Sequence, residues 1–227
     1  MSERIIQTVL TEDGSHTLYV PELDEHYHSV HGAVQESNHV FIKTGFHASD
    51  FETTDILEIG FGTGLNAILT LLEAVKLKKK VRYTTLEFYP LKKDLIEELN
   101  YPAKLSLKDN TEDYWVIQNA PWLESEGEFT EVNEYFSIRK LYVDFTKFKF
   151  NDSYNLIYFD AFAPDKQPEM WDSNLFDCIA SATVQDGVLT TYCAKGVVRR
   201  ALIAAGFNVE RLPGPPGKRE MLRGRKK

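Results

Sequence analysis

The chain has 227 residues, of which 43% are hydrophobic and 26% charged, and its formal net charge is −8. This composition is typical of a globular protein, and no apolar run approaches the ~18 residues that a membrane span needs. Residues 1–4 lack the pattern of a signal peptide, and the two cysteines match neither metal nor redox spacing. We therefore expect a cytoplasmic protein with no membrane partner.

The predicted elements begin with two strands at 5–10 and 16–20, joined by a turn at Asp13-Gly14. Residues 22–48 are polar and are expected to form a helix with loops. From residue 55 onward strands and helices alternate, which predicts a mostly parallel sheet with helices on both faces. The predicted strands lie at 55–59, 81–87, 138–143, 154–159, 187–193 and 206–211, with an antiparallel last strand at 218–223. The predicted helices lie at 64–78, 90–99, 169–182 and 195–205.

The fold class that this order predicts is a doubly wound, Rossmann-like α/β domain with a small N-terminal hairpin extension. We expect residues 1–50 to form the N-terminal hairpin and a segment that covers the active site, and residues 51–227 to form the α/β domain. Residues 101–137 are acidic and are predicted to be an insertion in that domain.

A glycine-rich loop follows the first strand of the α/β domain. Gly60, Gly62 and Gly64 alternate with other residues just before a predicted helix. Glycines let the backbone turn sharply and approach a ligand closely, and the helix start offers unpaired N–H groups. A dinucleotide-binding loop has its last glycine where this chain has Leu65, which favours S-adenosylmethionine over NAD and disfavours an NAD-dependent oxidoreductase.

Acidic residues follow the next predicted strands. Glu87 ends the second strand, about 20 residues past the glycine loop, where a carboxylate can accept hydrogen bonds from ribose hydroxyls. Asp144 ends the third strand and is a weaker candidate for contacting the adenine amino group, because Asp also serves turns.

Asp160 directly follows the fourth predicted strand, and Phe162 and Pro164 come soon after it. A carboxylate here can hold the N–H groups of an amine, orient its lone pair and ease proton loss, while an aromatic ring packs against the acceptor. We predict that Asp160 and Phe162 carry the chemistry and that Asp160 also borders the cofactor.

The last 33 residues are basic in an acidic protein. From Lys195 to Lys227 there are ten Lys or Arg and two Glu, a net charge of +8. A local positive face can find phosphates despite the overall charge, so we expect any RNA to bind at a defined patch and expect no DNA partner.

Four motifs, at 58–66, 159–164, 168–171 and 218–222, resemble the methyltransferase domain of the MnmC family, which completes 5-methylaminomethyl-2-thiouridine at the tRNA wobble position. The resemblance implies a methyltransferase that uses S-adenosylmethionine and binds the tRNA anticodon stem-loop. By motif match, the implied cofactor-binding residues are Glu58, Gly60, Gly62, Gly64, Asn66, Glu87, Asp144 and Asp160. The implied substrate-binding residues are Tyr27, Glu36, Arg199, Arg200, Lys218 and Arg219.

The sequence departs from this family in two ways. MnmC carries a flavin-dependent oxidase domain, for which 227 residues leave no room, so a stand-alone methyltransferase is implied. Its aminomethyl substrate would then come from separate oxidase or modification enzymes that act upstream. Ala161 replaces the usual glycine after the catalytic Asp, which leaves the fine substrate geometry open.

Other readings remain open. His26, His28 and His31 form an H-x-H-x-x-H cluster, but no further ligand has matching spacing, so we predict no metal. The acceptor could be a small-molecule or protein amine in place of tRNA. A catalytically silent RNA-binding protein on the same fold is disfavoured by Gly60, Glu87 and Asp160.

Overall fold

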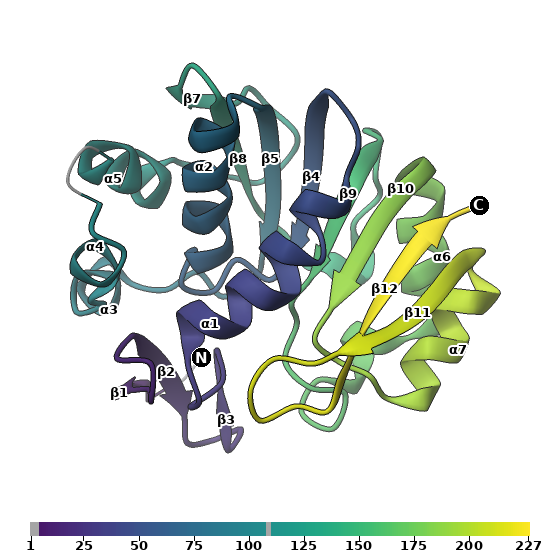
Figure 1. The fold of residues 1–227 in the computed structure, drawn as a ribbon, viewed down its shortest axis with the longest axis horizontal. Coiled ribbons are helices and arrows are strands. Elements are labelled where there is room, and N and C mark those ends of the chain that lie inside the picture. The colour runs from purple at the N-terminus through teal and green to yellow at the C-terminus, as the bar shows by residue number, and fades with distance from the viewer. Residues whose placement is uncertain (1–4, 108–109) are drawn as a thin grey trace.

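A mostly parallel sheet forms the centre of the molecule in the computed structural model, which describes residues 5–107 and 110–227 (Figure 1). Within these residues it has nine strands: eight in the order β11-β12-β10-β9-β4-β5-β8-β6, and β7 paired with β8. The strands are β4 (Thr53–Ile59), β5 (Lys80–Glu87), β6 (Trp122–Leu123), β7 (Thr130–Asn133), β8 (Phe136–Tyr142), β9 (Tyr154–Phe159), β10 (Thr183–Thr191), β11 (Phe207–Pro213) and β12 (Glu220–Lys226). The prediction about the signal peptide concerns residues 1–4, which lie outside the described residues.

The strand order confirms the doubly wound fold. β4 pairs in parallel with β5 on one side and with β9 on the other, so the chain winds outward from β4 in both directions. Ligands of such sheets bind beyond the carboxyl ends of the strands, where the winding direction switches. The antiparallel last strand is also confirmed, because β12 runs antiparallel to both β10 and β11.

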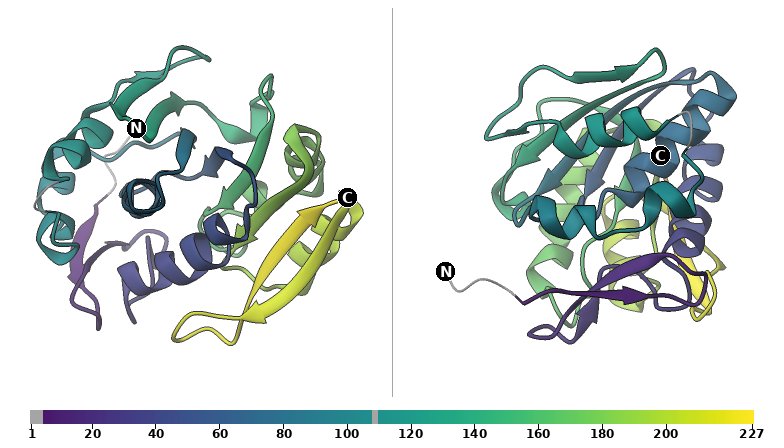
Figure 2. Two further views of the ribbon diagram at one scale, coloured as in Figure 1. Left: turned by 45° about the horizontal axis from the view of Figure 1, so that its top comes forward. Right: turned by 90° about the vertical axis from the view of Figure 1, so that its left-hand side faces the viewer.

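The N-terminal hairpin is confirmed as β1 (Gln7–Leu10) paired with β2 (His16–Val20), and a short β3 (Glu25–His26) adds a third strand. These strands and the loop between β11 and β12 lie at the same end of the molecule (Figures 1 and 2). Leu18 and Ile42 share a buried cluster with Leu65 of the first long helix, so the N-terminal segment packs on the α/β unit. The division of the chain at residue 50 stays a prediction.

The helices follow the prediction in part. They are α1 (Ala33–Ser37), the π-helix η1 (Asn38–Lys43), α2 (Leu65–Leu77), α3 (Lys93–Glu97), α4 (Tyr101–Lys104), α5 (Thr111–Asn119), α6 (Ser173–Ala182) and α7 (Gly196–Ala204), with 3-10 turns η2 (Phe46–Ala48), η3 (Phe145–Lys147) and η4 (Pro168–Trp171). The helix predicted at 90–99 shortens to α3, since Lys92 is extended and forms its N-cap. Asp172 interrupts the helix predicted at 169–182, because its side chain caps α6 by accepting from Asn174 N–H.

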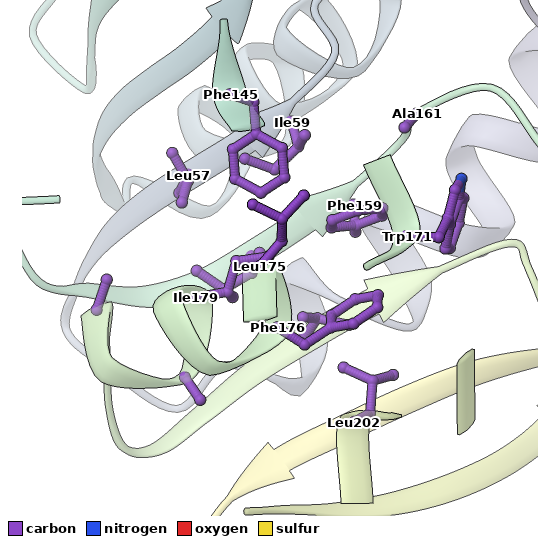
Figure 3. Close-up of a cluster of buried hydrophobic side chains, with 14 of the residues drawn as sticks. Leu57, Ile59, Phe145, Phe159, Ala161, Trp171, Leu175, Phe176, Ile179 and Leu202 are labelled. Carbon is purple, nitrogen blue, oxygen red and sulfur yellow. The ribbon is translucent and has the colours of Figure 1, made fainter. Parts of the chain in front are cut away.

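The core lies on both faces of the sheet. Leu57, Ile59 and Phe159 pack on the face that α6 and α7 cover, where Phe176 and Leu202 meet them (Figure 3). Successive strand residues point to opposite faces, so Glu58 shares the other face with the apolar cluster beneath α2. The carboxyl side chain of Glu58 therefore lies inside the core, directly below the glycine loop.

None of the helices in the described part of the chain combines the length and the apolar character that crossing a membrane requires.

Candidate active site

A cavity of about 560 Å³ opens at the carboxyl ends of β4, β5 and β9. This size is in the range of small-molecule sites. Its wall includes residues 25–31, 59–62, 86–89, 143–146 and 160–163, together with Glu36, Gln167, Glu169, Met170, Tyr192, Gly217 and Lys218. The N-terminal segment, the strand ends and the β11–β12 loop thus contribute to one cavity.

The glycine loop forms the floor of this cavity. Gly60 has φ +90°, and a Cβ there would lie 2.7 Å from the Asp160 carbonyl oxygen. Gly62 has φ +49°, and a Cβ there would lie 2.9 Å from the Tyr27 ring. Both positions therefore require glycine, because side chains are strained at positive φ and because no space remains for a Cβ.

Glu87 holds the glycine loop as well as facing the cavity. Its Oε2 accepts a hydrogen bond from Gly62 N–H at 3.2 Å, and its Oε1 accepts from the N–H groups of Phe88 and Tyr89. Phe88 and Tyr89 line the same region of the cavity with half-exposed rings. The sequence analysis did not name them, although their position directly after a strand end would have identified them as candidates.

Asp144 lines the cavity, but both of its carboxylate oxygens accept hydrogen bonds from residues of its own turn. Its Oδ1 accepts from the backbone N–H and the hydroxyl of Thr146, at 3.0 and 2.6 Å, and its Oδ2 pairs with Lys147 at 2.8 Å. The hydrogen bond from Lys147 is the main cause that lowers the pKa of the Asp144 carboxyl. An anionic Asp144 can still face a ligand amino group across the cavity.

Asp160 reaches the cavity from the end of β9. Its backbone N–H donates to the Ile59 carbonyl at 3.0 Å, which joins the ends of β4 and β9. Its Oδ2 accepts from Asn66 Nδ2 at 2.8 Å. Burial raises the pKa of the Asp160 carboxyl to about 7, against the lowering effect of the Asn66 hydrogen bond. A carboxyl with a pKa near neutrality is typical of a group that exchanges protons.

Two aromatic rings flank the cavity near Asp160. Phe162 and Tyr27 meet edge to face, with centroids 5.0 Å apart. Trp171 Nε1 donates to the Phe162 carbonyl at 2.8 Å and so fixes the loop that follows β9. The sequence motif contained Trp171, but this contact depends on a fold that the motif does not reveal.

Glu36 and Lys218 form an ion pair on the cavity wall. Lys218 Nζ donates to Glu36 Oε1 at 2.6 Å, while Glu36 Oε2 accepts from Ser29 N–H at 2.7 Å. Lys218 Nζ also lies 3.8 Å from the ring centroid of Tyr192, whose hydroxyl donates to the Ala161 carbonyl at 2.8 Å. Tyr192 directly follows β10 and was missed in the sequence, although its position at a strand end is again the available signal.

Six of the predicted site residues lie outside the cavity wall. Gly64 is the last glycine of the loop and does not line the cavity, and Glu58 and Asn66 are buried beneath the loop. The other three belong to the basic C-terminal region: Arg199 and Arg200 on α7, and the exposed Arg219 in the β11–β12 loop.

The three histidines of the N-terminal cluster face different partners. His28 Nε2 lies 2.9 Å from the Thr63 hydroxyl, and burial lowers the pKa of His28 to about 4, so the ring is neutral. His26 packs on Tyr19, and His31 pairs with Glu12 at 3.0 Å. Among residues 5–107 and 110–227, no group of three His, Cys, Asp or Glu is arranged to hold a metal ion.

Comparison with known sequences identifies related proteins. Residues 119–227 match a family model described as S-adenosyl-L-methionine-dependent methyltransferase. The bifunctional protein MnmC of tRNA 5-methylaminomethyl-2-thiouridine biosynthesis from Leptospira interrogans is 28% identical over 95% of this chain, and that from Cupriavidus metallidurans is 29% identical over 95%. The chain spans 35% and 33% of the length of these two relatives, about a third.

Comparison with solved structures agrees. The crystal structure of MnmC2 from Aquifex aeolicus matches 100% of this chain and 71% of its own, with a TM-score of 0.76 and 25% identity. Spermidine synthase from Thermotoga maritima shares the fold alone, with a TM-score of 0.54 and 13% identity over 99% of this chain and 73% of its own. The resemblance to the methyltransferase domain of MnmC and the prediction of a methyltransferase fold are therefore confirmed.

Proposed function

Because this chain is similar to the methyltransferase domain of MnmC, we propose that it transfers a methyl group to the aminomethyl nitrogen of a tRNA wobble uridine. The product would be 5-methylaminomethyl-2-thiouridine, formed from 5-aminomethyl-2-thiouridine. The two relatives are MnmC proteins of tRNA 5-methylaminomethyl-2-thiouridine biosynthesis, which supports this substrate. Since the chain spans about a third of the length of those bifunctional relatives, the proposal concerns the methylation step alone.

The residues of the cavity floor fit S-adenosylmethionine. Gly60 and Gly62 leave a cradle that a Cβ would fill, which suits close contact between backbone and ligand. Glu87, Phe88 and Asp144 line the same cavity, so the Glu87 carboxylate would accept hydrogen bonds from the ribose hydroxyls and the other two would contact the adenine. When bound there, S-adenosylmethionine would supply a methyl group activated by a positively charged sulfur.

Asp160 would prepare the acceptor amine. The amine must lose a proton before its lone pair can attack, since an alkylammonium has a pKa near 10. A carboxylate oxygen of Asp160 would accept an N–H of the amine, orient the lone pair and take up the proton. Phe162 and Tyr27 would pack against the uracil ring, and Glu36 with Lys218 would face its polar edge.

The basic C-terminal region would bind the anticodon stem-loop. Arg199, Arg200 and Arg219 lie outside the cavity and would contact phosphates around a nucleotide whose base enters it. Lys218 differs from these three because it lies in the cavity wall and pairs with Glu36. Phosphate contacts of this kind add affinity without reading sequence. We place the protein in the cytoplasm as part of the same proposal.

The observation that carries the proposal is the Asp160 carboxyl, which lies beside the glycine loop and an aromatic pair in one cavity. The test is transfer of labelled methyl from S-adenosylmethionine to tRNA that carries 5-aminomethyluridine, using the wild-type chain and Asp160→Ala. Label at the wobble position with the wild type alone would support the proposal. Incorporation that survives removal of RNA by ribonuclease would instead favour a small-molecule or protein amine as acceptor.

A further inference from the structure

Asn66 joins two carboxyl groups beneath the cavity. Its Nδ2 donates to Asp160 Oδ2 at 2.8 Å and to Glu58 Oε1 at 3.1 Å, so both hydrogens of the amide are used. Glu58 is completely buried and Asn66 is 2% exposed, whereas Asp160 faces the cavity. One amide nitrogen of α2 therefore connects the proposed catalytic carboxyl to a carboxyl inside the core.

The surroundings of Glu58 disfavour a second negative charge. Burial and the Asp160 charge oppose the anion of Glu58, and they outweigh the hydrogen bonds that favour it, from Thr85 Oγ1 to Glu58 Oε2 at 2.8 Å, from Asn66 and from Tyr83. Tyr83 and Tyr158 are themselves affected by the charge of Glu58. Within the described residues, none of the groups that shift the pKa of Glu58 is a cation, and burial raises that pKa to about 8.

Asp160 has more favourable neighbours than Glu58. Lys218 stabilises its anionic form, while Glu36 opposes it, and these two form an ion pair of their own. Glu58, Tyr83 and Tyr192 also sense the Asp160 charge. Two buried carboxyls that share one amide do not both ionise readily, so the group nearer to Lys218 and the cavity takes the charge first.

We propose that Glu58 is a positioning residue for methyl transfer, which in its neutral form fixes the Asn66 amide so that Asp160 presents the anion to the acceptor amine. This inference rests on the proposed function, and it assigns Glu58 and Asn66 to the support of Asp160 in place of direct cofactor contact. Asn66 Oδ1 has no partner in the described part of the chain, so a contact of Asn66 with the cofactor is the competing assignment.

The first test follows the two carboxyls by NMR in the chain with ¹³C-labelled Asp and Glu side chains. In the wild type we expect Asp160 to titrate near pH 7 and Glu58 about one unit higher. Asn66→Leu removes a hydrogen bond that lowers the pKa of Asp160, so its titration should move up by about one pH unit. Glu58→Gln should remove the higher step and leave that of Asp160 in place.

Thr70→Val is the matched control for this titration. Thr70 lies on the same helix, and its hydroxyl donates to the Asn66 carbonyl and lies 3.3 Å from the Tyr158 hydroxyl, whereas the hydrogen bonds to the two carboxyls come from other residues. It should leave both titrations unchanged. An Asp160 titration that is the same in Asn66→Leu as in the wild type would overturn the proposal.

The second test separates positioning from cofactor contact. Calorimetry with S-adenosylmethionine should give dissociation constants within about threefold of wild type for Glu58→Gln and Asn66→Leu, while kcat of Asn66→Leu at pH 7 falls about fivefold and recovers toward pH 9. A tenfold loss of cofactor affinity in either variant would overturn positioning in favour of cofactor contact. If the wild type binds cofactor but does not methylate tRNA, the proposed function fails, whereas the titrations and affinities still decide the role of Glu58.

Discussion

Lys218 and Glu36 are 182 residues apart in the sequence, yet the Lys218 ammonium donates to the Glu36 carboxylate at 2.6 Å in the wall of the cavity. The pair joins the β11–β12 loop to the N-terminal segment. Glu36 is 6% exposed, so its charge depends on Lys218 and on the Ser29 N–H for compensation. The cavity wall is therefore complete only when the β11–β12 loop packs against the N-terminal segment.

A double-mutant cycle with Glu36→Gln and Lys218→Met should measure a coupling of about 1–2 kcal/mol in the free energy of unfolding. This value is below that of fully buried pairs, because the Lys218 side chain is 34% exposed and partly screened by solvent. Denaturant unfolding of the four proteins is the measurement. The surface pair Arg223–Glu210, treated the same way, should couple by less than about 0.5 kcal/mol; equal values for the two pairs would contradict this account.

Gly62→Ala should weaken binding of S-adenosylmethionine at least tenfold. The backbone there has φ +49°, and the added methyl group would lie 2.9 Å from the Tyr27 ring, so the loop and the ring must both shift. Calorimetry of cofactor binding is the measurement. Gly196→Ala, at the first residue of α7 and away from the cavity, should bind cofactor like the wild type.

Asp160→Asn should lower kcat by about 100-fold or more while cofactor affinity stays within about threefold. Asn keeps the shape of the side chain but cannot accept the proton of the amine. In the wild type, kcat should rise with pH through about 7, because the pKa of Asp160 lies there and the anion is the active form. Asp165→Asn, which removes an exposed carboxyl paired with Lys195, is the control and should keep full activity.

Glu58→Gln should make the protein less sensitive to alkaline pH. The folded-state pKa of Glu58 is raised from 4.5 to about 8, so folding favours its protonated form, and this stability is lost as the pH rises from about 4.5 to 8. Over this range the wild type should lose about 3–5 kcal/mol that the Gln variant keeps. Urea unfolding at pH 5 and pH 8 compares the two, and parallel pH dependence would show that Glu58 is ionised in the folded state.

Replacing Arg199, Arg200 and Arg219 together by Gln should weaken tRNA binding about tenfold or more and reduce its salt dependence. Methylation of a free 5-aminomethyluridine nucleoside should be unaffected, since none of the three lines the cavity. Filter binding at several salt concentrations is the measurement. Lys76→Gln with Lys78→Gln, at the opposite end of α2 from the glycine loop, serves as the control for a general change of charge.

The sequence alone determined the sheet, the glycine loop and the placement of Glu87 and Asp160 at the site. These features are local, because alternation within a strand, positive φ at glycine and the residue after a strand end depend on neighbours in the chain. Parallel strands then bring their carboxyl ends to one edge whatever the details of the packing. For the same reason, the position of Tyr192 in the cavity wall, directly after a strand end, could also have been predicted from the sequence.

Tertiary structure alone decided which predicted residues meet. The pairing of Lys218 with Glu36 depends on how the N-terminal segment packs against the β11–β12 loop, and no local pattern encodes that contact. The same holds for the contact of Glu58 with Asn66, which forms beneath the glycine loop once α2 packs on the sheet. Burial raises the pKa of the Glu58 carboxyl, against the lowering effect of the hydrogen bonds from Thr85 and Asn66, because desolvation is a property of the assembled fold.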